Sequence, residues 1–116
     1  MYPKTYATVV GMNFHDVKYK PKVDDSVILL KDPKNEYDDE AIAVFTVHKE
    51  KLGYVANSTR TVAKGTYSAG RLYDKFDHYV VGVVQFILRN EAIVEVMLED
   101  AQYTIFGEFY IELPDR

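Results

Sequence analysis

Residues 30–44, LKDPKNEYDDEAIAV, place a polar loop between two apolar segments. The run that leads into it, 26–31 (SVILLK), is short and aliphatic, as buried strands are. The loop, 32–39 (DPKNEYDD), is rich in Asp, Pro and Asn, which favour turns because they restrict φ or bond their own backbone. The segment that follows, 40–48 (EAIAVFTVH), is again β-branched and aromatic. This stretch therefore predicts two strands joined by a structured loop.

Further strands are predicted on both sides of this pair. Residues 79–88 are apolar almost throughout, which predicts that both faces of that strand are covered, whereas residues 104–113 alternate between apolar and acidic side chains. The short connection at Lys49–Lys51 predicts a hairpin, and Arg89–Glu91 a tight turn. The remaining predicted strands are 5–14, 51–56 and 92–98.

The segment between residues 56 and 79 has a helical pattern. Asn57 or Ser58 can cap a first short helix that ends near Gly65, with Arg60 and Lys64 four residues apart on one face. Ser68 can cap a second helix over 68–76, in which Leu72 and Phe76 share an apolar face.

We therefore expect a mainly β fold with a short helical insertion. It is an OB-like small β-barrel of about six to seven strands, with one or two helices after the fourth strand, because closure removes exposed sheet edges. The chain of 116 residues forms one domain, residues 1–116, by this interpretation.

Composition excludes several classes of protein. The chain has no cysteine, which excludes disulfides, a thiolate nucleophile and Cys-based metal centres. It has no apolar run long enough to span a bilayer and no signal peptide, so we expect a cytoplasmic protein without a membrane partner. The net charge of −4 argues against broad binding to duplex nucleic acid. Residues 57–75 nevertheless hold four bases and one acid, which predicts a local basic face.

Catalytic chemistry finds little support in the residues. No serine stands in a nucleophile-elbow motif, the three histidines are scattered, and the glycines are isolated rather than gathered in a phosphate-binding loop. The acidic run Asp38–Glu40 fails the EF-hand pattern. We therefore expect no enzyme activity, no catalytic residue, no metal and no cofactor.

Three polar-aromatic clusters instead point to a binding surface, because rings stack bases and cations hold phosphates. An aspartate within such a site would accept a hydrogen bond from a sugar hydroxyl and repel a phosphate. The alternative interpretation is structural: the rings belong to the core, and Asn35 and Asp38 are ordinary turn formers. The candidate residues are Asn13, Phe14 and His15; Asn35, Tyr37 and Asp38; and Tyr54, Asn57, Arg60 and Lys64.

The chain resembles the HIRAN domain family at these same positions. The similarity is carried by three motifs: a V-x-G strand at Val9–Phe14, a D-P-x-N-x-Y-D-x-x-A-I-x-V block at Leu30–Val44, and an L-G-Y strand at Leu52–Val55. Residues 55–69 look like the stand-alone bacterial members of the family. The resemblance implies an OB-like barrel with inserted helices, in agreement with the expected strands.

The resemblance also implies a function. HIRAN domains fused to fork-remodelling helicases bind single-stranded DNA and prefer a free 3′ end, which implies a role in DNA repair. Carried over by position, Tyr37 would stack a terminal base, Asp38 would contact the 3′-hydroxyl and Asn35 would support their loop. Phe14 and Tyr54 would face the same groove.

Two positions depart from the DNA-end-binding pattern. Asn13 and Asn57 stand where those proteins carry cations, which weakens the phosphate contribution to affinity. Arg60 and Lys64 are candidate replacements. The expected partner is single-stranded DNA, with a protein from the DNA-processing machinery as a further candidate. The alternatives are a protein-interaction module with the same barrel and little DNA affinity, and an enzyme or small-ligand binder.

Overall fold

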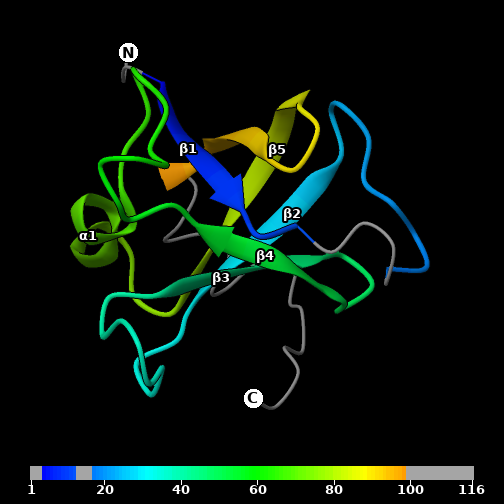
Figure 1. The fold of residues 1–116 in the computed structure, drawn as a ribbon. Helices are drawn as coiled ribbons and strands as arrows, with labels where there is room; N and C mark the ends of the chain where they lie inside the picture. Colours follow the sequence, from blue (N-terminus) through cyan, green and yellow to red (C-terminus); the bar gives the residue numbers. More distant parts are fainter. Residues whose placement is uncertain (1–3, 13–16, 99–116) are drawn as a thin grey trace.

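Antiparallel strands close into a barrel in this computed structural model, which describes residues 4–12 and 17–98 (Figure 1). Within the described residues the order around the barrel is β1-β4-β3-β2-β5-β6. The strands are β1 (Thr5–Val10), β2 (Ser26–Lys31), β3 (Ile42–Thr46), β4 (Lys51–Val55), β5 (Tyr79–Ile87) and β6 (Ala92–Val96). The barrel predicted from the sequence is confirmed.

Alternation along the strands creates two apolar clusters. In β2, Val27 and Leu29 point into the barrel, whereas Ile28 and Leu30 belong to a cluster on its outer side. The inner cluster also holds residues from every other strand and from the helix. The outer cluster is smaller and consists of Ile28, Leu30, Ala43 and Phe45, with Tyr54 and Tyr79 packed against it.

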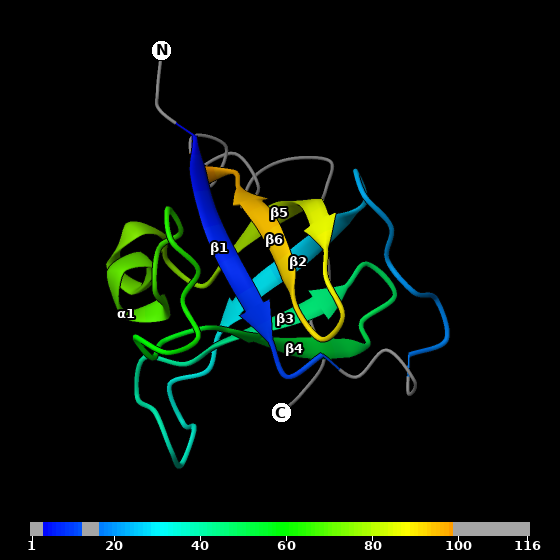
Figure 2. The same cartoon turned by 45° about the horizontal axis from the view of Figure 1, so that its top comes forward.

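The seam between β1 and β4 has fewer paired residues than any other pair of neighbouring strands in the described barrel. Among the described residues two pairs form it, Val9 with Val55 and Val10 with Tyr54. Beside it, the buried Thr8 hydroxyl lies 2.8 Å from the Thr66 hydroxyl and accepts from the Ala63 N–H at 3.1 Å. The chain after β4 therefore closes the part of β1 that β4 leaves open, and Figure 2 shows β1 with this segment and α1 on one side and β6 on the other.

The helical insertion is shorter than predicted. Helix α1 (Ala69–Leu72) continues into the 3₁₀-helix η1 (Tyr73–Lys75), and the Ser68 hydroxyl caps α1 by accepting from the Arg71 N–H, as expected. Leu72 and Phe76 are both buried in the inner cluster, which confirms their shared apolar face.

The predicted helix over 57–65 is wrong. This segment forms turns, in which Thr61 and Val62 both donate to the Ser58 carbonyl and the Ser58 hydroxyl accepts from the Arg60 N–H. Tertiary contacts explain the difference, since the Thr8 hydroxyl binds the Ala63 N–H and thereby holds this segment against the barrel. Gly65 has a positive φ of 87°, which ends any helical path there.

Three strand predictions also need correction or stay open. The first strand ends at Val10 rather than residue 14, because Gly11 turns the chain with φ of 66°. The end of β5 is not covered on both faces: Phe86 is 63% exposed, and Ile87 and the following Leu88 are exposed too. The predicted strand 104–113 lies outside the described residues. Within the described part, no helix is both long and apolar enough to cross a membrane.

Candidate functional site

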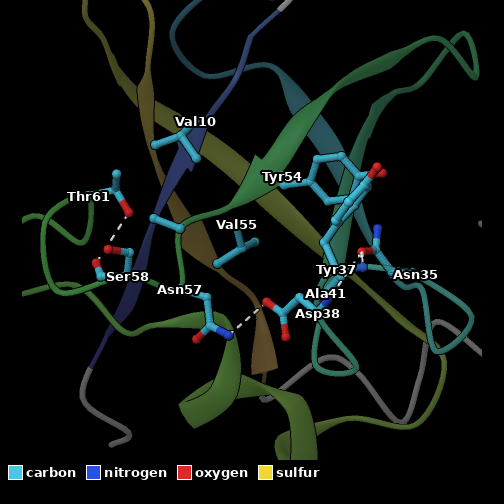
Figure 3. A pocket seen from close by; sticks show the side chains of 11 residues that line it. Val10, Asn35, Tyr37, Asp38, Ala41, Tyr54, Val55, Asn57, Ser58 and Thr61 are labelled. Atoms are coloured by element: carbon cyan, nitrogen blue, oxygen red, sulfur yellow. Dashed lines mark hydrogen bonds between the residues drawn. The ribbon is translucent and has the colours of Figure 1, made fainter.

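A groove of about 410 Å³ opens where the end of β1, the β2–β3 loop and the end of β4 meet (Figure 3). It brings together segments that are far apart in the sequence. Its lining residues are Val10, Asn35, Tyr37, Asp38, Ala41, Tyr54, Val55, Ala56, Asn57, Ser58 and Thr61. Aliphatic side chains and two tyrosine rings thus share the groove with a carboxylate, two amides and hydroxyls.

Asn35 gives the β2–β3 loop its shape. Its side-chain oxygen accepts from the backbone N–H groups of Tyr37 at 2.9 Å and Asp38 at 3.1 Å. The backbone N–H of Asn35 donates to the backbone carbonyl of Asp32. These bonds fix the backbone on both sides of residue 36. The Tyr37 side chain is consequently carried on an ordered loop while being 93% exposed. Such a ring is available to stack on a flat ligand.

The Asp38 carboxylate is held from two directions. One oxygen accepts from the Glu40 N–H at 2.9 Å, and the other accepts from the Asn57 side-chain amide at 2.9 Å. An ionised carboxylate has about four acceptor positions, so two stay available to a ligand. The arrangement presents a negative charge of fixed orientation inside the groove (Figure 3).

Asn57 ties three segments together. Its amide donates to Asp38 in the β2–β3 loop, and its side-chain oxygen accepts from the Gly70 N–H of α1 at 2.8 Å. The residue thus supports the groove by positioning Asp38 against the helical insertion. It does not cap a helix over 57–65, which was one of its expected roles.

Tyr54 lies between the outer cluster and the groove. Its ring packs against the outer cluster, as a core residue would, and it also lines the groove. The Lys51 ammonium lies 4.2 Å from the ring centroid and donates to the Tyr54 hydroxyl. Lys51 is not among the residues predicted for the site, and it does not itself line the groove.

The structure gathers half of the predicted site residues in one place. Arg60 and Lys64 are exposed and do not line the groove, although Arg60 lies between Ser58 and Thr61, which do. Asn13, Phe14 and His15 lie outside the described residues. The residues that line the groove as predicted are Asn35, Tyr37, Asp38, Tyr54 and Asn57.

Several lining residues were not predicted. Val10 pairs with Tyr54 and Val55 pairs with Val9 at the β1–β4 seam, and the V-x-G and L-G-Y-V motifs gave a signal for both residues. Ser58 and Thr61 were assigned to a helix, which hid their contribution to the groove wall. In residues 4–12 and 17–98, no group of three His, Asp or Glu side chains is placed to hold a metal ion.

Comparison with known proteins identifies the family of the chain. The model of the HIRAN domain matches residues 3–113 of the chain. The crystal structure of the HIRAN domain of human HLTF aligns with a TM-score of 0.55 and 22% sequence identity, covering 80% of this chain and 74% of that chain. A search of curated proteins found no match.

Proposed function

The chain belongs to the HIRAN domain family of DNA-binding modules, and on this premise we propose that its groove binds single-stranded DNA with a preference for a free 3′-hydroxyl end. One observation carries the proposal: the exposed Tyr37 ring and the oriented Asp38 carboxylate are adjacent residues on one ordered loop of the groove. The pair offers a stacking surface and a hydroxyl acceptor within the reach of one nucleotide.

Each side chain has a separate task in this proposal. Tyr37 stacks the terminal base, an interaction that contributes about 1–3 kcal/mol per base in single-strand binders. Asp38 accepts a hydrogen bond from the terminal sugar hydroxyl, while Asn57 and the Glu40 N–H hold the carboxylate in place. A phosphate in place of the hydroxyl would bring a second negative charge against Asp38 in a partly enclosed site, which is unfavourable.

The test compares two thymidine oligonucleotides that differ only at the 3′ end, one with a hydroxyl and one with a phosphate. Fluorescence anisotropy with a 5′ label should give at least about tenfold weaker binding of the phosphorylated strand, a difference of about 1.4 kcal/mol. Asp38→Asn should reduce this discrimination because it removes the charge that repels the phosphate. Asp39→Asn is the matched control, since Asp39 is an exposed neighbour that does not line the groove.

The outcomes separate the parts of the proposal. Equal binding of the two strands would remove the preference for a hydroxyl end and leave single-strand binding in place. Lack of binding to either strand at low salt would overturn the nucleic-acid function of this groove. That second result would favour the alternative of a protein-interaction module with the same barrel.

A further inference from the structure

An irregularity in β4 changes which side chains share the outer face of the barrel. Gly53 pairs with Val44, but the next pair joins Lys51 to Phe45, so Leu52 is an extra residue with no partner on β3. A bulge of this kind shifts the alternation of side chains by one position. Leu52 therefore points into the barrel, where it is buried in the inner cluster.

This bulge makes Lys51 and Tyr54 neighbours. Tyr54 pairs with Ala43 and Lys51 pairs with Phe45, and both of these partners belong to the outer cluster. In a regular strand, residues three apart point to opposite faces. Because of the bulge they share one face, so the ammonium lies over the Tyr54 ring and bonds its hydroxyl.

The Lys51 ammonium has N–H donors available for a ligand. It carries three N–H groups, and the hydroxyl of Tyr54 takes one of them. The side chain is exposed, so a ligand in the groove can approach it without displacing the protein. Tyr54 lines the groove, and the Lys51 cation lies over the ring of this lining residue. Single-strand binding sites combine these two groups, a ring for the base and a cation for the backbone.

We propose that Lys51 is a phosphate-binding residue of the groove, contacting the backbone of the strand whose terminal base lies against Tyr37. The inference rests on the proposed function and adds to it the cation that Asn57 does not provide. It also assigns a role to the bulge at Leu52, which turns an exposed lysine of the hairpin toward the ligand. Lys49, two residues earlier in the β3–β4 turn, is exposed but does not contact Tyr54, and it provides the matched comparison.

The experiment measures the affinity of a short thymidine oligonucleotide against salt for the wild type, Lys51→Gln, Lys51→Arg and Lys49→Gln. Loss of one phosphate contact should reduce the slope of log K against log salt by about 0.7 for a single strand. We expect this reduction in Lys51→Gln, with roughly twofold to fivefold weaker binding at low salt. Lys51→Arg should keep the wild-type slope, and Lys49→Gln should stay close to it.

A second set of oligonucleotides locates the contact. Each carries one neutral methylphosphonate linkage at a different distance from the 3′ end. One of these linkages should weaken binding by the wild type and have no effect on Lys51→Gln, because the lost charge has no partner in that variant.

The results distinguish this inference from the proposed function. A wild type that binds no oligonucleotide overturns both. A wild type that binds, together with equal slopes for Lys51→Gln and Lys49→Gln, overturns the role of Lys51 and leaves the function of the groove intact. Thermal unfolding of each variant shows whether a weaker Lys51→Gln reflects lost contact or lost fold, and Lys51→Arg decides the case if the Gln variant is unstable.

Discussion

The Glu50 carboxylate joins two loops that are distant in the sequence. It accepts from the Lys18 N–H at 2.7 Å and from the Tyr19 N–H at 3.2 Å, which connects the β3–β4 turn to the β1–β2 connection. These bonds favour the ionised form. The hydrogen bond from the Lys18 backbone, followed by that from Tyr19 and the nearby charges of His48 and Lys18, lowers the pKa of Glu50 below its ordinary value.

A lowered pKa in the folded state links stability to pH in a defined direction. The contribution of Glu50 is fully present above the ordinary carboxyl pKa of 4.5 and is lost as the pH falls through the lower value of the folded protein. Glu50→Gln should therefore lower the Tm modestly at neutral pH, and the difference from wild type should shrink as the pH falls below about 4. Thermal unfolding followed by circular dichroism across this range measures it.

Glu36→Gln is the control for that measurement, because Glu36 is an exposed carboxylate of the β2–β3 loop. It should change the Tm little at any pH. A constant difference between Glu50→Gln and wild type from pH 7 to pH 3 would contradict the role of the ionised carboxylate and indicate a packing effect.

At the scale of elements, the sequence predicted the features that depend on hydrogen bonds between residues close together in the chain. Ser68 caps its helix, and the β2–β3 loop is a turn held by Asn35. The sequence interpretation treated turn formation and ligand binding as alternatives for Asn35 and Asp38. In the structure they are compatible, because the turn is what places Asp38 in the groove.

The features that the sequence did not predict depend on hydrogen bonds and strand pairing between residues far apart in the chain. Residues 57–65 have acceptable helix-capping signals but form turns. The Thr8 hydroxyl of β1 accepts from the Ala63 N–H, and the Asp38 carboxylate of the β2–β3 loop accepts from the Asn57 side chain. The bulge at Leu52 is equally hidden, since KLGYV is compatible with regular alternation. The sequence did not single out Lys51 for this reason: only the paired strand shows that it shares a face with Tyr54.

Gly53 permits the close approach of β4 to β1 at the seam. A Cβ at this position would lie 2.3 Å from the Val10 carbonyl oxygen, which belongs to the backbone and cannot move without opening the seam. Gly53→Ala should therefore reduce the free energy of unfolding by about 3 kcal/mol, at the upper end for overpacking, as measured by urea denaturation.

Gly70→Ala provides the comparison for this prediction. A Cβ there would meet the Glu40 carboxylate at 2.7 Å and the Asn57 side-chain oxygen at 3.3 Å, and the ends of both side chains can shift. Its effect on unfolding should stay within about 1 kcal/mol, since alanine is also the better helix former. Equal stability of Gly53→Ala and wild type would show that the β1–β4 seam can open enough to admit a methyl group.

At the scale of the whole molecule, charge limits the way in which this domain can hold DNA. The net charge is −4, so the protein as a whole repels a polyanion, although salt screens that repulsion beyond about 10 Å at 0.1 M. Favourable contacts with phosphate must therefore come from cations close to the groove. Lys51 lies beside a groove residue, while Arg60 and Lys64 are exposed on the turns that follow β4.

The number of these cations predicts the salt dependence of binding. If each of the three meets one phosphate of a single strand, the slope of log K against log salt should be about −2. Anisotropy titrations over a series of potassium chloride concentrations measure this slope, and a duplex of the same length should bind weakly because no broad basic surface follows its two strands. A slope near zero would show that stacking and hydroxyl recognition alone hold the strand. A slope several times steeper would require cations beyond these three. It would also show that attraction to the phosphate backbone supplies most of the affinity, which contradicts a groove that mainly recognises the end of the strand.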